Sequence, residues 1–240
     1  MDFKAIGFDF FGTIVDAKAD GKACVLSMCN HLQQCGYEIS DDDFIANYRS
    51  TTSEYRETRH EALREVNNCI WVADTLKKMG INEKASNPNI VSAVEKYFNP
   101  WQLTLVSDAP IVLKRLSEVF NIALVSNFTD SAFIHRSLRK LEIEKFFDHI
   151  IDSDTVGWRK PHPKIFKHFL KLSKAKAEEA VFIGDDLEAD IKGANAIGIK
   201  SVLLNRPSYV QYKQRNTKIV PDHMVSSLTE FEELLSGGKI

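Results

Sequence analysis

Short apolar segments alternate with amphipathic helical segments along the whole second half of the chain. The predicted strands cover residues 121–126, 149–152, 180–184, 200–204 and 223–225. The predicted helices cover residues 109–120, 130–140, 163–172, 187–196 and 228–235, where apolar residues recur at helical spacing. This order predicts a parallel sheet with helices on both faces, because parallel strands need a crossover connection between them.

A block of helical sequence interrupts this pattern near its start. Residues 4–9 are an apolar run too short for a helix, and we predict a buried strand there. Helical periodicity then dominates, and the predicted helices cover residues 21–34, 41–66, 69–79 and 89–98. The simplest organisation is one α/β core, formed by residues 1–15 and 105–240, into which residues 16–104 are inserted as a helical segment.

Composition argues against several classes of protein. The 240 residues carry a net charge of −2, which gives no reason to expect a nucleic acid or an anionic membrane as partner. No apolar run approaches the roughly 20 residues that a membrane span needs. The chain enters its first predicted strand at once, so we expect no signal peptide. Four cysteines without a Cys-x-x-Cys pair favour reduced thiols, and we expect a cytoplasmic protein.

The first predicted strand ends in a candidate catalytic residue. Asp9 lies at its carboxyl end, the position at which open α/β sheets bind their ligands. Gly12 permits a sharp turn of the backbone, and the Thr13 hydroxyl can hold a neighbouring oxygen by a hydrogen bond. A carboxylate on a rigid strand end serves as a nucleophile, a metal ligand or both. The alternative is an aspartate that only caps the loop.

Two later segments carry groups that complement such a carboxylate. The predicted strand at residues 121–126 ends in Ser126 and is followed by Asn127, a hydroxyl and an amide that donate hydrogen bonds to anionic oxygens. Lys160 stands directly before a proline that leads into a helix. A surface lysine and a simple turn are the plainer explanations of each feature taken alone.

Carboxylates gather after the predicted strand at residues 180–184. Asp185, Asp186 and Asp190 follow it within a few positions. Carboxylates so close together repel each other unless a cation joins them, and Mg²⁺ prefers oxygen ligands of this type. Combined with Asp9, these residues predict a Mg²⁺-containing pocket at the carboxyl edge of the sheet.

Together these strand ends resemble the four motifs of the haloacid dehalogenase superfamily, a large group of hydrolases with an aspartate nucleophile. The matching residues are Asp9, Gly12 and Thr13 for the first motif, Ser126 for the second, Lys160 and Pro161 for the third, and Gly184, Asp185, Asp186 and Asp190 for the fourth. The resemblance implies a Rossmann-like core with the helical insert, residues 16–104, as a cap over the site. It also implies attack by Asp9, an aspartyl-enzyme intermediate and hydrolysis of that intermediate by water.

The resemblance further implies which residues hold the metal ion. Mg²⁺ would be bound by Asp9, the backbone carbonyl of Phe11 and Asp185, with Asp186 and Asp190 close behind these ligands.

Phe11 departs from the pattern of the superfamily's phosphatases, which have a second aspartate at this position to protonate the leaving alkoxide. Phenylalanine cannot transfer a proton, a step typically worth about 10²–10⁴-fold in rate. The 2-haloacid dehalogenase branch also has an aromatic residue here, since halide leaves without a proton, and its substrate-gripping cap arginine is similar to Arg49. At the fourth motif, however, sequences of that branch resemble Ser-Ser-Asn, whereas this chain has Gly184, Asp185 and Asp186.

We therefore expect a Mg²⁺-dependent phosphatase that acts on a small phosphorylated metabolite with an activated leaving group. In this interpretation Ser126, Asn127 and Lys160 bind the transferring phosphoryl group, and Thr13 positions Asp9.

Two alternatives stay open. The first is a 2-haloacid dehalogenase in which Arg49 and Phe11 contact the substrate, although Arg49 fits equally well on a solvated helix face. The second is a non-catalytic protein that binds a phosphorylated ligand. In each case we expect a small-molecule partner and a monomer or homodimer.

Overall fold

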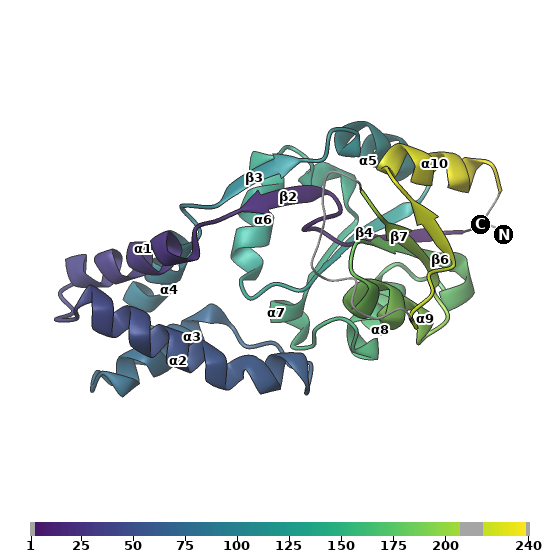
Figure 1. Ribbon diagram of the computed structural model, residues 1–240. Helices are drawn as coiled ribbons and strands as arrows, with labels where there is room; N and C mark the ends of the chain where they lie inside the picture. Colours follow the sequence, from purple (N-terminus) through teal and green to yellow (C-terminus); the bar gives the residue numbers. More distant parts are fainter. Residues whose placement is uncertain (1–2, 207–217, 239–240) are drawn as a thin grey trace.

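A six-stranded parallel sheet forms the centre of the protein (Figure 1). The computed structural model describes residues 3–206 and 218–238. From one edge to the other, the strands are β5 (His149–Asp152), β4 (Asn121–Ser126), β1 (Ala5–Phe8), β6 (Ala180–Gly184), β7 (Lys200–Leu204) and β8 (His223–Val225). Every neighbouring pair is parallel, which confirms the predicted α/β class. Because β1 is central and fully buried, Asp9 emerges in the middle of the sheet's carboxyl edge.

Helices cover both faces of the sheet (Figure 1). On one face lie α5 (Ala109–Ser117), α6 (Ser131–Lys140) and α10 (Leu228–Ser236), and on the other lie α8 (Pro163–Leu172) and α9 (Lys192–Asn195). Shorter elements are α7 (Ser153–Val156), 3₁₀ turns at Glu144–Phe146 and Ala177–Glu179, and a π-helical turn at Leu187–Ile191. Within the described ranges, no helix combines the length and the apolar character needed to cross a membrane.

The inserted segment is built from four helices, α1 (Gly21–Gln34), α2 (Asp41–His60), α3 (Asn68–Lys78) and α4 (Pro88–Tyr97). Each begins after a residue whose side chain accepts a hydrogen bond from the first helical turn; these are Asp20, Ser40, Asn67 and Asn87. The second helix was predicted to continue to residue 66 but ends at His60. Leu63 then has a positive φ of 54°, which is incompatible with a continuing helix. Leucine rarely adopts this conformation, so the sequence did not indicate that the helix ends here.

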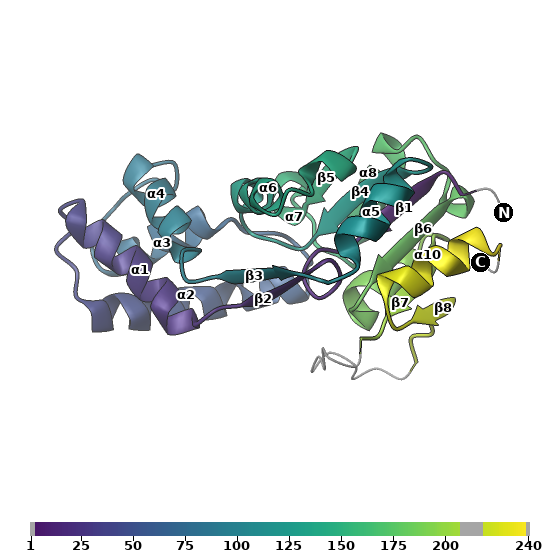
Figure 2. The same ribbon diagram turned by 90° about the horizontal axis from the view of Figure 1, so that it is seen from above.

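Two short strands join this helical segment to the sheet. β2 (Val15–Lys18) and β3 (Gln102–Leu105) pair in antiparallel fashion, with Val15 opposite Leu105. Figures 1 and 2 show this ribbon running from the sheet toward α1 and α4. Neither strand was predicted, because each has only four residues and its partner lies at the other end of the inserted segment.

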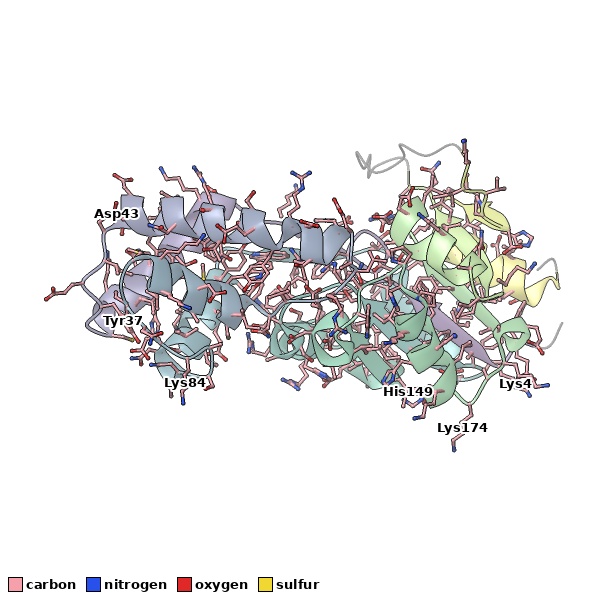
Figure 3. The ribbon with its side chains drawn as sticks, turned by 90° about the horizontal axis from the view of Figure 1, so that it is seen from below. Lys4, Tyr37, Asp43, Lys84, His149 and Lys174 are labelled. Carbon is pink, nitrogen blue, oxygen red and sulfur yellow. The ribbon has the colours of Figure 1, made fainter. Side chains whose placement is uncertain are left out.

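The carboxyl ends of the parallel strands face the helical segment. Lys4, which precedes β1, lies at the end of the molecule opposite Tyr37, which follows α1 (Figure 3). The chain therefore runs along β1 toward the inserted helices, and Asp9 lies on their side of the sheet.

Glu65 joins the inserted segment to the core. Its side chain is 1% exposed and forms ion pairs with Arg59 of α2 (Nε–Oε1, 3.1 Å) and with Arg159 of the core. The carboxylate also accepts hydrogen bonds from Ser153 Oγ (2.5 Å) and from the Val66 N–H (3.0 Å). Burial lowers the pKa of the Arg159 guanidinium, and the attraction of Glu65 opposes that shift. One buried carboxylate thus holds arginines from both parts of the chain.

Main-chain hydrogen bonds lie on either side of this ion pair. The Glu65 N–H donates to the Gly157 carbonyl (3.2 Å), and the Arg159 N–H donates to the Leu63 carbonyl (2.9 Å). The segment after α2 is therefore fastened to the core by its backbone as well as by its side chains.

We expect Glu65→Gln to lower the free energy of unfolding by about 3 kcal/mol, because it leaves two arginines without their shared anion. Urea denaturation followed by tryptophan fluorescence measures the loss. Glu54→Gln is the matched control, since Glu54 pairs with Lys78 at a site where the glutamate side chain is 63% exposed, and no measurable change is expected. Equal stabilities of the two variants would show that Glu65 does not fasten the insert.

Candidate active site

Asp9 is held in a fixed position at the end of β1. Its backbone N–H donates to the Ile183 carbonyl of β6 (3.0 Å), and the residue is 7% exposed. Thr13 Oγ1 donates to Asp9 Oδ2 (3.1 Å), and Lys160 Nζ donates to Asp9 Oδ1 (2.6 Å). Gly12 makes this return possible, because its φ of 89° lies in the region that favours glycine. Both carboxylate oxygens are thus oriented by side chains that the sequence predicted for the site.

Lys160 is positioned by the segment that follows β4. The Asn127 side chain donates from Nδ2 to the Lys160 carbonyl (2.9 Å) and accepts the Lys160 N–H at Oδ1 (2.6 Å). The Lys160 ammonium also donates to the Val125 carbonyl (2.7 Å). The Asn127 side chain therefore contacts Lys160, and its amide group is not free to bind the phosphoryl group as the sequence predicts. Ser126, at the end of β4, is buried and lines the cavity beside Lys160.

Asp190 reaches the site because the chain after β6 forms a π-helical turn in place of part of the continuous helix predicted at residues 187–196. The N–H groups of Asp190 and Ile191 both donate to the Asp186 carbonyl (2.8 and 3.3 Å). The Asp190 carboxylate accepts the Asp186 N–H in return (3.0 Å). Gly184 makes room for it, since a Cβ atom there would lie 2.2 Å from Asp190 Oδ2. Turns of this kind are frequent at functional sites.

Three buried carboxylates form the acidic part of the site. Asp9, Asp185 and Asp190 each have an oxygen within 4.8 Å of the others. Asp190, which we expect close behind the metal ligands, thus lies as near to Asp9 and Asp185 as this distance allows. The Asp186 carboxylate accepts hydrogen bonds from the N–H groups of Glu188 (2.9 Å) and Ala189 (3.1 Å), so it stabilises the turn from the rim of the cavity.

The charges of this cluster fit a divalent cation. Lys160 Nζ lies 2.7 Å from Asp190 Oδ1 as well as 2.6 Å from Asp9 Oδ1. Burial alone would lower the pKa of Lys160, but attraction to Asp190 and Asp9 outweighs it and raises the pKa. Burial raises the pKa of Asp190 to about 7, with Lys160 opposing the shift and Asp9 adding to it. Carboxylates this close together repel each other unless a cation joins them, and an oxygen-ligated ion such as Mg²⁺ fits the oxygen atoms of Asp9, Asp185 and Asp190.

A cavity of about 620 Å³ opens onto these residues. Its core side includes Asp9, Phe11, Ser126, Lys160, Asp185 and Asp190, and its other side includes Arg59, His60, Glu61 and Leu63 from the end of α2 and the segment after it. The cavity therefore lies between the sheet and the inserted helices. Its volume is in the range of small-molecule sites.

Arg49 does not line this cavity, which corrects the position expected for the substrate-gripping arginine. Arg49 is exposed on α2, whereas Arg59 lies ten residues further along the same helix and does line the cavity. Ten residues correspond to roughly 15 Å of helix, too far for Arg49 to reach. The sequence could not separate the two arginines, because the difference depends on which end of α2 meets the core.

Phe11 belongs to an aromatic cluster at the edge of the cavity. Its ring centroid lies 4.6 Å from that of Phe10, 5.1 Å from that of Phe128 and 5.8 Å from that of Trp101. The side chain two positions after Asp9 thus contacts other rings, and it offers no group that transfers a proton.

Proteins of similar sequence are known for nearly the whole chain. It is 32% identical to the glyceraldehyde 3-phosphate phosphatase of Pyrococcus furiosus over 152 residues, which cover 62% of this chain and 63% of that protein. It is 26% identical to the ribulose-1,5-bisphosphate 5-phosphatase of Halopiger xanaduensis, over 97% of this chain and 99% of that protein.

A solved structure and a family of sequences complete the comparison. The 2-haloacid dehalogenase from Pseudomonas syringae has a TM-score of 0.72 at 19% identity, covering 98% of this chain and 99% of that one, and this likeness shows the fold alone. Residues 6–204 match the family described as haloacid dehalogenase-like hydrolase. This match includes all four motifs and confirms the resemblance drawn from them: the chain belongs to the haloacid dehalogenase-like hydrolase family.

Proposed function

We propose that this hydrolase is a Mg²⁺-dependent phosphatase of small phosphorylated metabolites. The observation that carries the proposal is the buried cluster of Asp9, Asp185 and Asp190 around Lys160, which combines a positioned nucleophile with a donor set suited to Mg²⁺. The phosphatase names of the two relatives support the same reaction class. The free thiols of all four cysteines agree with the expected cytoplasmic location.

In the proposed reaction, Asp9 attacks the phosphorus atom of the substrate. Thr13 and Lys160 hold its two oxygens, so the carboxylate is oriented before the substrate enters. The Ser126 hydroxyl, the Asn127 main chain and the Lys160 ammonium bind the phosphoryl oxygens. Mg²⁺, when bound by Asp9, Asp185 and Asp190 with the Phe11 carbonyl, supplies positive charge that stabilises the transferring group.

The second half of the reaction regenerates the enzyme. Water attacks the phosphorus of the aspartyl phosphate, the Asp9 carboxylate is released and inorganic phosphate leaves. Residues 16–104 act as a cap that keeps bulk water away from the intermediate, and residues 1–15 and 105–240 form the catalytic core. The end of α2 supplies the cap's contribution to the cavity.

The carboxylates favour phosphoryl transfer over carbon–halogen cleavage. A haloacid dehalogenase needs no metal ion, so Asp185 would be a buried carboxylate with no metal ion to bind in that reaction. Phe11 fits both reactions, because an activated leaving group departs without a proton just as halide does.

We expect the protein to release phosphate from an aryl phosphate in the presence of Mg²⁺ and to release no halide from 2-chloropropionate. Chelation of Mg²⁺ and the isosteric variant Asp9→Asn should each abolish phosphate release, as one removes the cation and the other the nucleophile. Phosphate and chloride are measured in parallel reactions. Asp42→Asn, an exposed position of α2, is the matched control and should retain full activity.

Three other outcomes would contradict this function. Halide release in the presence of chelator would indicate a dehalogenase. Phosphate release that survives Asp9→Asn would exclude the proposed nucleophile. Binding of a phosphate analogue without any turnover would indicate a non-catalytic binding protein.

A second prediction concerns the missing proton donor. Phe11→Asp should raise the ratio of alkyl phosphate to aryl phosphate turnover by up to about 10²-fold, because only the poorer leaving group needs protonation. Phe11→Asn removes the same ring and matches aspartate in size, but it cannot donate a proton, so we expect a ratio well below that of Phe11→Asp. Equal ratios in the two variants would assign the effect to the loss of the ring and not to proton transfer.

A further inference from the structure

A second cavity of about 370 Å³ adjoins the catalytic one. The two share Phe11, Arg59 and Asn127, so they meet beside the residue that replaces the usual proton donor. Its walls carry six aromatic side chains, Phe11, Trp71, Tyr97, Phe98, Trp101 and Phe128, and we call this cavity the aromatic chamber. None of the motifs of the active site accounts for it.

The walls of the aromatic chamber support one another. The ring centroids of Phe11 and Phe128 are 5.1 Å apart, those of Phe98 and Phe128 are 5.5 Å apart, and those of Trp101 and Phe128 are 5.8 Å apart. These separations are typical of favourable aromatic pairs. Since the rings come from the nucleophile turn, the segment after β4 and the segment after α4, the chamber forms only in the folded protein.

Three buried polar atoms of residues that line the chamber lack hydrogen-bond partners in the part of the chain that the structure describes. They are Nε1 of Trp71 and Nε1 of Trp101, both donors, and Oδ1 of Asn68, an acceptor. Trp71 is 7% exposed and Asn68 is 3% exposed, and both line the chamber. An unsatisfied buried polar group is unfavourable, and a ligand that carries an acceptor and a donor would satisfy Trp71 and Asn68.

We propose that the aromatic chamber binds the leaving group of the substrate, and that this group is an aromatic ring with a polar substituent. The inference rests on the proposed phosphatase function and names its substrate class, a phosphate monoester of a phenol. In-line attack by Asp9 drives the leaving group to the side of the phosphoryl group away from Asp9. Flat rings pack against the aromatic walls, and the ring substituent meets Trp71 or Asn68.

The chemistry of a phenol agrees with the residue at position 11. As the bond between Asp9 and phosphorus forms, the bond between phosphorus and the phenolic oxygen breaks, and its electron pair leaves on the phenolate. Water then converts the aspartyl phosphate into Asp9 carboxylate and dihydrogen phosphate, and the phenolate takes up a proton in solution. No step requires a proton from Phe11, because a phenolate is a far better leaving group than an alkoxide.

The test compares two phosphates whose leaving groups have similar acidity but different shape. They are 2,4-dinitrophenyl phosphate, which releases an aromatic ring, and acetyl phosphate, which does not. For the unmodified enzyme we expect kcat/KM to favour the aryl ester at least about tenfold, the gain expected from burying a ring among aromatic side chains.

Ala17→Leu fills the chamber from the β2 strand, since Ala17 lines it. We expect the ratio of aryl to acetyl kcat/KM to fall about tenfold or more in this variant. Lys18→Leu introduces the same side chain at the next, exposed position, which points to the opposite face of the ribbon, and the ratio should stay unchanged. Trp71→Phe keeps an aromatic ring at this position but removes the indole N–H donor. We expect the ratio to fall about fivefold in this variant.

The outcomes separate the two proposals. Hydrolysis of both phosphates without a preference, or a ratio that Ala17→Leu and Trp71→Phe leave unchanged, would overturn the aromatic chamber while phosphatase activity stands. Hydrolysis of neither phosphate would overturn the phosphatase function and the inference with it. A preference lost in Ala17→Leu and retained in Lys18→Leu would support both.

Discussion

The contact of Lys160 with two buried carboxylates underlies the rest of the site. Its ammonium lies 2.6 Å from Asp9 and 2.7 Å from Asp190, and all three groups are almost without exposure to water. A buried charge is unfavourable unless it is paired, so each of these side chains depends on the other two. Asn127 fixes the backbone of Lys160, and the sheet fixes Asp9, which means that the position of the ammonium is set by parts of the chain far apart in the sequence.

The proposed reaction divides the space above the sheet into a charged half and an aromatic half. Carboxylates, ammonium and hydroxyl surround the place of the phosphoryl group, while the rings around Phe11 surround the place of the group that departs. Phe11 stands where the two halves meet. In the proposed reaction, its presence would favour leaving groups that need no acid and would provide a surface against which such groups pack.

The sequence predicted those features that depend on local pattern. Strand ends, helix starts and the motif residues Asp9, Ser126, Lys160 and Asp185 follow from apolar periodicity and from motif order, and the structure gathers all four around one cavity. The features that the sequence could not predict depend on contacts between distant parts of the chain. The four-residue strands of the ribbon carry too little periodicity, and the π-helical turn that brings Asp190 inward is defined by backbone hydrogen bonds. The sequence also could not show that Arg59, and not Arg49, approaches the core, because this depends on which end of α2 packs near the sheet.

The ribbon of β2 and β3 has a consequence for how such a protein can change. Val15 and Leu105 are paired neighbours, so the chain leaves the sheet and returns to it at a single point. A longer, shorter or different helical segment joined at that point would leave the path of the core chain unaltered. In the proposed function, the residues that act on the phosphoryl group lie on the core side of this junction, whereas Trp71 and other residues that would contact the leaving group lie on the side of the inserted helices. Changes in the inserted helices would therefore alter the choice of substrate and leave the residues of the reaction in place.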